Sequence, residues 1–251
     1  MDVRIVEDKQ SGAEMIVHEI IDLIKTKVRV NIGLATGGSM EPVYEELISR
    51  CRKSAINFDD VRWFLLDEYL GLGVDDPARY RSVIMRELLE PLGLHGEWLF
   101  GPETDVASLD EAGSRYEAVI RDAGGIDLQL LGIGRDGHIG FNEPGSSLGS
   151  RTRAKRLHTE TRKDNARYFG DDISAVPTRA ITQGIGTISD ACRLILAAWG
   201  ESKAEAIASC AEGPVTALSP ASALQFHPDV TVVVDGAAAS RLQLKEYYSS
   251  A

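Results

Sequence analysis

Short apolar runs alternate with amphipathic stretches along this sequence, and that alternation constrains the fold more than any other feature. Runs rich in β-branched and apolar residues predict strands at 28–35, 61–66, 126–133, 192–199 and 229–235. Stretches with helical spacing of apolar residues predict helices at 11–27, 40–53, 78–90, 108–123 and 202–213. Strands separated by helices return to the same edge of a sheet, which favours parallel pairing. We therefore predict an α/β fold, a doubly wound and mostly parallel sheet with helices on both faces.

The length of the chain favours a single domain. It has 251 residues, 43% of them hydrophobic, and α/β folds of this size are often one domain. We predict one Rossmann-like domain over 1–251, with a lid at about 144–190, where the sequence is irregular and shows no strong period. This segment holds Arg151, Arg153, Lys155, Arg156, Arg162, Lys163 and Arg167. So basic a segment in an acidic chain indicates a lid that faces an anion.

The charge balance excludes some partners. Lysine and arginine number 27 against 38 acidic residues, a net charge of −11, and the pI is near 5.0. An acidic surface argues against nucleic acid or an anionic membrane as the partner. No run of about 18 apolar residues predicts a membrane span. Cys51, Cys192 and Cys210 are scattered and odd in number, so we expect reduced thiols and a cytoplasmic protein.

The predicted strands end in polar residues that parallel pairing would bring together. The strand at 28–35 ends in Thr36-Gly37-Gly38-Ser39, and the next is followed by Asp67-Glu68. The third leads into the loop from Gly134 to Glu143, and the fourth ends in Gly200-Glu201-Ser202-Lys203. Ligands of parallel sheets bind beyond the carboxyl ends of the strands. We therefore expect one crevice shared by Asp67, Asp136, His138, Glu143 and Lys203.

The "TGGS" turn at 36–39 is typical of an anion site. Its glycines let the backbone approach a ligand, and the first N–H groups of the following helix are free to bind it. The alternative is a tight turn with Ser39 as the helix cap. "GIGRDG" at 132–137 matches a dinucleotide motif, but "HIGFNEPGSS" is a poor helix start and the chain is basic where that motif needs an acid. A small phosphate ester therefore fits better than a nucleotide.

His138 stands between two acids in the loop after the third strand. Histidine gives and takes protons near neutral pH, and the carboxylates of Asp136 and Glu143 would orient its ring. A structural histidine and a metal ligand are the alternatives. Asp67, if buried, would gain the raised pKa of a general base, although it could also cap a helix or pair with a lid arginine. The remaining histidines are interpreted as surface or structural residues: His18, His95, His158 and His227.

Five blocks of the sequence, in this order, resemble the glucosamine-6-phosphate deaminases of the glucosamine/galactosamine-6-phosphate isomerase family. The blocks are "LATGGS" (34–39), "LLDEYLGL" (65–72), "GRDGHIGFNEPGSSLGSRTR" (134–153), "TRKDNARYF" (161–169) and "GESKAEAI" (200–207). The resemblance implies conversion of D-glucosamine 6-phosphate and water to D-fructose 6-phosphate and ammonium, without a cofactor. It leaves a galactosamine 6-phosphate substrate open, and "FNEP" speaks against a 6-phosphogluconolactonase. A non-catalytic sugar-phosphate sensor would not need the four acid–base residues.

The resemblance also assigns roles to single residues. His138 would move the proton during ring opening, with Asp136 and Glu143 tuning it, and Asp67 would carry the proton from C2 to C1. Residues at the family's phosphate-holding positions are Thr36, Gly37, Gly38, Ser39, Arg167 and Lys203. The segment after "NEP" would close as a lid.

Some members of the family are hexamers activated by N-acetylglucosamine 6-phosphate. Ser146, Arg153 and Lys155 match the activator-site positions of those members. This chain stops at "LKEYYSSA", where allosteric members run longer and add an aromatic residue. Shorter members are unregulated monomers, so the resemblance leaves both a monomer and a homo-oligomer open.

Overall fold

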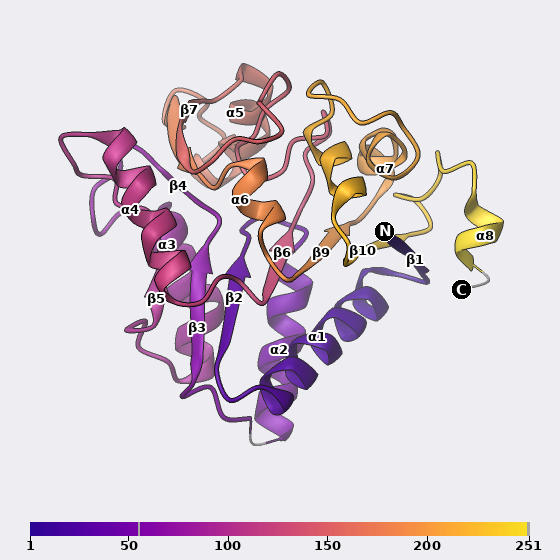
Figure 1. Cartoon of the computed structure of the whole chain (residues 1–251), viewed down its shortest axis with the longest axis horizontal. Helices are drawn as coiled ribbons and strands as arrows, with labels where there is room; N and C mark the ends of the chain where they lie inside the picture. The colour runs from indigo at the N-terminus through magenta and orange to yellow at the C-terminus, as the bar shows by residue number, and fades with distance from the viewer. Residues whose placement is uncertain (55, 250–251) are drawn as a thin grey trace.

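Seven short strands form one sheet in which every described pairing is parallel (Figure 1). The computed structural model describes residues 1–54 and 56–249. In sheet order the strands are β1 (Asp2–Val6), β10 (Val230–Asp235), β9 (Arg193–Ala198), β6 (Leu128–Leu131), β2 (Val30–Leu34), β3 (Val61–Leu65) and β5 (Leu99–Phe100). The predicted doubly wound α/β fold is confirmed, and each of the five predicted strands is present.

The central strands are apolar because helices cover both faces of the sheet. All residues of β2 and β6 are buried. The two strands of this seven-stranded sheet that the sequence did not predict, β1 and β5, lie at its edges. In β1 only Val3 is fully buried, and β5 has two residues, so neither shows the continuous apolar run of a central strand.

Helices follow the strands in the predicted order, and α1 and α2 lie side by side (Figure 1). The α-helices are α1 (Lys9–Thr26), α2 (Glu41–Lys53), α3 (Tyr80–Ile84), α4 (Leu109–Asp122), α5 (Thr159–Asn165), α6 (Ile185–Ser189), α7 (Ala204–Ala211) and α8 (Lys245–Ser249). Short 3-10 and π segments are η1 (Met85–Leu89), η2 (Glu90–Leu92), η3 (Ala166–Phe169), η4 (Glu201–Lys203) and η5 (Pro220–Phe226). Within the described residues, no helix is long and apolar enough to cross a membrane.

The predicted helix at 78–90 is not one regular helix. It begins as α3, widens into the π segment η1, and tightens into η2 around Pro91. Proline lacks the N–H that a continuing helix needs, so the regular spacing stops there. The apolar positions of this stretch still face the core, with Ile84, Leu88 and Leu89 buried.

The segment at 144–190 is not irregular, and this part of the prediction was wrong. It contains β7 (Arg153–Arg156), α5, η3, β8 (Arg179–Thr182) and α6. β8 pairs antiparallel with β7 on one side and with β4 (Asp67–Tyr69) on the other, forming a second sheet of three strands. The sequence of β7, Arg-Ala-Lys-Arg, is too polar for a local pattern to reveal a strand.

A small apolar core supports this second sheet. Its buried members are Tyr69, Phe141, Leu157, Ala166, Val176 and Ala180. The rings of Tyr80 and Phe141 stack with centroids 5.8 Å apart. The lid segment is therefore packed on aromatic side chains, and Figure 1 shows β7 and α5 beyond the ends of β2 and β3.

Strand β2 is the point from which the sheet is built in two directions. The chain continues from β2 to β3 on one side, then returns to place β6 on the other side. Ligands of open α/β sheets bind at such a switch point, beyond the carboxyl ends of the strands. The loops after β2 and β6 flank this point.

Candidate active site

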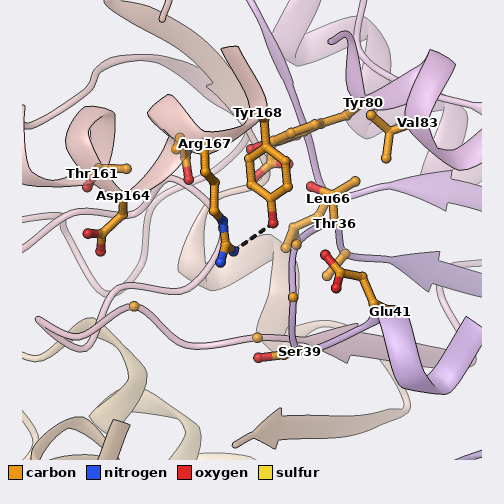
Figure 2. A pocket seen from close by; sticks show the side chains of 18 of the residues that line it. Thr36, Ser39, Glu41, Leu66, Tyr80, Val83, Thr161, Asp164, Arg167 and Tyr168 are labelled. Carbon is orange, nitrogen blue, oxygen red and sulfur yellow. Dashed lines mark hydrogen bonds between the residues drawn. The ribbon is translucent and has the colours of Figure 1, made fainter. Parts of the chain in front are cut away.

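A cavity of about 820 Å³ lies at the carboxyl ends of β2, β3, β6 and β9, under the lid segment. The residues from these strand ends that line it include Thr36, Gly37, Gly38, Ser39, Leu66, Asp67, Gly132, Ile133, Gly134, His138, Trp199, Ser202 and Lys203. The lid segment adds Thr161, Asp164, Asn165, Arg167 and Tyr168, several of which Figure 2 shows around the cavity. Residues far apart in the sequence therefore meet in one pocket.

The "TGGS" turn forms one wall. Gly37 has a φ of +102°, a conformation that favours glycine, and a Cβ on Gly38 would lie 3.4 Å from Nη2 of Arg167. α2 begins at Glu41 with Met40 as its cap and no side-chain capping bond, so Ser39 is not the helix cap. The backbone carbonyl of Ser39 accepts a hydrogen bond from the Trp199 indole at 3.0 Å. This hydrogen bond anchors the turn, and the residues of the turn line the cavity.

Two cations line the same cavity as this turn. Arg167 projects from η3, and Lys203 lies in η4, where its Nζ donates to the Ile133 carbonyl at 2.7 Å. Burial lowers the pKa of Lys203 from its usual value. Loss of solvent makes each remaining charge interaction stronger, so this end of the cavity suits a phosphate.

Asp67 is the first residue of β4 and is 5% exposed. Burial, and then the neighbouring charge of Glu68, raise the pKa of its carboxyl well above the usual range. Glu68 has a different role, because its carboxylate accepts the backbone N–H groups of Tyr80 and Arg81 at 2.9 and 3.0 Å. The capping role that the sequence left open for Asp67 thus belongs to Glu68, and Asp67 faces the cavity.

His138 also lines the cavity and is held by two carboxylates. Its Nδ1 is 2.6 Å from Oδ1 of Asp136 and 3.7 Å from Oε2 of Glu143. Burial tends to raise the pKa of Asp136, but the hydrogen bond and charge of His138 outweigh it and lower that pKa to about 2. Because Asp136 engages Nδ1, Nε2 is the ring nitrogen available to a ligand.

Gly134 leaves the space that the imidazole occupies. A Cβ at this position would lie 2.1 Å from Cε1 and 2.2 Å from Nδ1 of His138. The glycine is therefore needed for the close approach of the ring to the strand end. "GIGRDG" serves this turn, and no described helix begins within it, unlike a dinucleotide motif.

Glu143 and Asp136 contact His138 but are not among the cavity-lining residues. Glu143 is 1% exposed and also contacts His158, a residue that the sequence analysis interpreted as surface or structural. Its Oε1 accepts the His158 backbone N–H at 3.1 Å, and its Oε2 lies 3.6 Å from Nδ1 of His158. No local sequence pattern predicts the contact between Glu143 and His158, because it depends on the packing of β7 against the loop.

Asp136, His138 and Glu143 are also a group that could hold a metal ion within the described residues, with ligand atoms within 4.8 Å of one another. His138 and Asp136 contact each other directly at hydrogen-bond distance. A metal bound through Nδ1 would have to break that bond. The geometry fits an oriented imidazole better than a metal centre.

Most basic residues of the lid segment do not line the large cavity. Of the seven basic residues singled out in the sequence, Arg167 lines the large cavity. Arg151 pairs with Glu117 and Asp190, and Arg162 donates to the Ile173 and Val176 carbonyls. Arg151 and Arg162 form contacts outside the cavity, because the short strands and helices of the segment point their basic side chains in different directions.

The three residues at activator-site positions occupy different surroundings. Ser146 is buried and its Oγ has no hydrogen-bond partner among the described residues. Arg153 donates to Oδ1 of Asn142 at 2.9 Å, and burial lowers its pKa. Lys155 lines a second cavity of about 640 Å³ together with Arg156 and His158.

A glycine-rich turn that shares one cavity with two cations, a buried acid and an oriented imidazole defines a class of proteins, the α/β enzymes that move protons on small phosphorylated molecules. The sequence profile described as glucosamine-6-phosphate isomerases/6-phosphogluconolactonase matches residues 7–233. The chain belongs to this family. The resemblance noted in the sequence is confirmed over nearly its whole length.

Several named proteins are similar to the chain. Glucosamine-6-phosphate deaminases of Streptomyces coelicolor and Mycolicibacterium smegmatis are each 51% identical over 248 residues, covering 99% of this chain and 95% of theirs. A solved monomeric glucosamine-6-phosphate deaminase superposes with a TM-score of 0.93 at 40% identity, covering 96% of this chain and 100% of that one. The 6-phosphogluconolactonase from Leishmania guyanensis shares the fold at 20% identity and a TM-score of 0.74, covering 94% of this chain and 97% of that one.

Proposed function

We propose that this protein is a glucosamine-6-phosphate deaminase, which converts D-glucosamine 6-phosphate and water to D-fructose 6-phosphate and ammonium. One observation carries the mechanism: Asp67 and His138 line the same cavity as the glycine-rich turn at 36–39. Relatives that bear this name align with nearly the whole chain at about half identity. The reaction is an isomerisation coupled to deamination, and it needs proton transfers at the ring oxygen, C2 and C1.

Binding of the phosphate would fix the sugar in the cavity. The hydroxyls of Thr36 and Ser39, the backbone of Gly37 and Gly38, and the cations Arg167 and Lys203 surround the proposed phosphate position. A dianion held by several donors cannot rotate freely, so the carbons that react stay aligned with the acid–base groups. Binding energy at one end of the sugar is thereby used to orient the other end.

His138 would open the sugar ring. In its protonated form Nε2 gives a proton to the ring oxygen, and in its neutral form it takes the proton of the C1 hydroxyl. Asp136 remains ionised at neutral pH because its pKa is about 2, so it keeps the ring oriented through Nδ1. Such a positioned proton transfer contributes roughly a hundred- to ten-thousand-fold to the rate.

Asp67 would then move the proton that isomerises the chain. Its carboxylate removes the proton from C2 of the open-chain sugar while protonated His138 returns a proton to the C1 oxygen, which forms an enolamine. Asp67 then gives its proton to C1. The resulting imine at C2 takes up water and releases ammonium. The raised pKa of Asp67 brings its proton affinity closer to that of the carbon acid than an exposed aspartate could, which favours transfer in both directions.

We propose that the reaction uses no cofactor, because two side-chain acid–base groups and water supply every proton that moves. Dialysis against EDTA should leave the rate unchanged within about two-fold, since none of these steps needs a Lewis acid. A loss of activity that Zn²⁺ or Mg²⁺ restores would instead place a metal among Asp136, His138 and Glu143.

The direct test is incubation of the pure protein with glucosamine 6-phosphate, followed by assays for ammonium and fructose 6-phosphate. Both products should form in equal amounts. Folded protein that forms neither would contradict the proposal. Galactosamine 6-phosphate is a second substrate to test, because the configuration at C4 is read by cavity shape. A third is 6-phosphogluconolactone, whose hydrolysis without amine release would indicate the lactonase activity.

Regulation, assembly and location are further expectations with their own tests. We propose that one catalytic domain spans 1–251, with the lid at 144–190 closing over the sugar, and that the protein acts in the cytoplasm, where charge retains phosphorylated sugars. Light scattering distinguishes a monomer from a homo-oligomer, and cell fractionation tests the location. A rate that N-acetylglucosamine 6-phosphate does not change would remove the activator site expected at Ser146, Arg153 and Lys155.

A further inference from the structure

Tyr168 is a cavity-lining residue that the sequence analysis did not single out. It follows Arg167 in the 3-10 segment η3, and both side chains point toward the turn at 36–39 (Figure 2). Tyr168 is 42% exposed and lines the cavity. Nothing in the spacing of "NARYF" distinguishes this tyrosine from a surface residue.

The hydrogen bond between the two side chains has a fixed direction. Nη2 of Arg167 lies 2.6 Å from the Tyr168 hydroxyl, and the guanidinium carbon lies 4.6 Å from the centre of the ring. A guanidinium only donates, so the tyrosine oxygen accepts. The proton of the hydroxyl is therefore free to be donated to another group.

The Tyr168 hydroxyl lies close to the turn at 36–39, where the phosphate is proposed to bind. The Tyr168 hydroxyl is 3.8 Å from where a Cβ on Gly37 would be, and Nη2 of Arg167 is 3.4 Å from where a Cβ on Gly38 would be. The two donors thus stand over two consecutive glycines of the anion turn. Burial raises the pKa of Tyr168, which the Arg167 charge only partly opposes, so the phenol stays protonated at neutral pH.

We infer that the Tyr168 hydroxyl donates a hydrogen bond to the phosphate of the substrate, and that Arg167 and Tyr168 hold this phosphate from the lid side. The inference rests on the proposed function for the identity of the phosphate ester, but inorganic phosphate can serve as the probe. The hydroxyl would bind the anion directly. Because it accepts a hydrogen bond from the charged Arg167, it would also be polarised and donate more strongly. The lid would then contribute two donors to the phosphate rather than one.

The test compares Tyr168→Phe with the unaltered protein. Phenylalanine keeps the ring beside Arg167 and removes only the hydroxyl, so the melting temperature should stay nearly the same. A hydrogen bond to a charged group is worth about a ten-fold change in affinity, so the Kd for inorganic phosphate, measured by ³¹P NMR titration, should rise about ten-fold. The KM for glucosamine 6-phosphate should rise similarly, with a much smaller change in kcat. Tyr247→Phe, at an exposed tyrosine of α8, is the matched control and should change neither constant.

A second comparison separates direct contact from positioning of Arg167. In an Arg167→Ala background, Tyr168→Phe should still weaken inorganic phosphate binding by about three-fold or more. No effect of Tyr168→Phe in that background would show that the tyrosine acts only through Arg167, which would overturn the inference. An unchanged phosphate Kd in the single variant would overturn it as well.

The two proposals can fail separately. Protein that releases no ammonium but loses phosphate affinity on Tyr168→Phe would contradict the deaminase proposal and retain the tyrosine as an anion ligand. Active protein whose phosphate Kd and KM do not change on Tyr168→Phe would support the deaminase proposal and overturn the role of the tyrosine as an anion ligand.

Discussion

Asp67 is a buried acid whose charged form opposes folding. Burial disfavours its charged form, and the folded-state pKa therefore lies above the unfolded value. Between those two pKa values the folded protein binds more protons than the unfolded chain. The contribution of protonated Asp67 to the free energy of unfolding is thus fully present below the unfolded pKa, near 3.8. It is lost as pH rises through the raised folded pKa.

Replacing Asp67 by asparagine should separate these two effects. Asp67→Asn removes the base, so exchange of the C2 proton with solvent should fall at least a hundred-fold while substrate still binds. The same variant should unfold at a higher urea concentration than the unaltered protein at pH 8, but not at pH 3, because only the charged form is penalised.

The control for that prediction is Asp59→Asn, at an exposed aspartate in the turn before β3. It should change neither exchange nor stability at either pH. Retained exchange in Asp67→Asn would remove Asp67 from the base role.

Gly134 offers a way to move His138 without altering it. In Gly134→Ala the added Cβ occupies the space of the imidazole, and the ring can rotate away more easily than the backbone can shift. We expect kcat to fall about a hundred-fold, with a loss of stability of about 1 kcal/mol. Steady-state kinetics and urea unfolding measure the two effects.

Gly236→Ala is a suitable comparison, because no atom lies within 4 Å of its Cβ position and its φ is not left-handed. It should retain full activity. If Gly134→Ala were equally active, the position of the imidazole would not limit the reaction.

At the scale of elements, α4 fastens the lid segment to the parallel sheet. Glu117 of α4 accepts the backbone N–H of Thr152 at 2.8 Å, and also the hydroxyls of Thr152 and Thr187 and the guanidinium of Arg151. Burial tends to raise the pKa of Glu117, but these hydrogen bonds outweigh it and lower the pKa. One carboxylate therefore joins α4 to the start of β7 and to α6.

Removing the charge of Glu117 should loosen this junction. Glu117→Gln should lower the free energy of unfolding by about 2 kcal/mol at pH 7, the usual size for hydrogen bonds to a charged group. The difference should be present above pH 4.5 and should shrink as pH falls through the lowered pKa of the carboxylate. Urea unfolding at several pH values measures it.

Glu111→Gln, on the exposed side of the same helix, provides the control. Its ion pair with Arg115 spans 3.5 Å and lies in solvent, so the cost should be below about 1 kcal/mol. Equal losses in both variants would mean that Glu117 does not fasten the lid segment.

At the scale of the whole molecule, the cavity is lined both by the strand ends of the parallel sheet and by Asp67 and Tyr69 of the small antiparallel sheet. A ligand that touches both should stabilise the folded state as one unit, because the unfolded chain has no such site. At a concentration one hundred times its Kd, fructose 6-phosphate should add about 2.7 kcal/mol. For a chain of this size that corresponds to a rise of about 5–10 °C in Tm.

Thermal denaturation with and without fructose 6-phosphate measures this shift. Fructose at the same concentration should raise Tm much less, because it lacks the phosphate. The shift should also shrink in Arg167→Ala. Equal shifts from the two sugars would argue against a phosphate site in this cavity.

The sequence by itself determined the parallel sheet and the place of the site within it. The central strands are buried on both faces, so their residues form continuous apolar runs that are visible locally. Their polar ends include Thr36, Asp67, His138 and Lys203, and parallel pairing places such ends on one rim. The edge strands β1 and β5 were not predicted, because β1 is only partly buried and β5 is very short.

Only the tertiary structure decided what surrounds those side chains. The small sheet forms because Asp67 pairs with Thr182 and Arg153 pairs with the same threonine, contacts that span many residues and leave no local period. Through it Asp67 becomes buried, His158 reaches Glu143, and Arg167 and Tyr168 come to face the glycines of the anion turn. Periodicity reports which face of an element is apolar, whereas partners distant in the chain are chosen by packing.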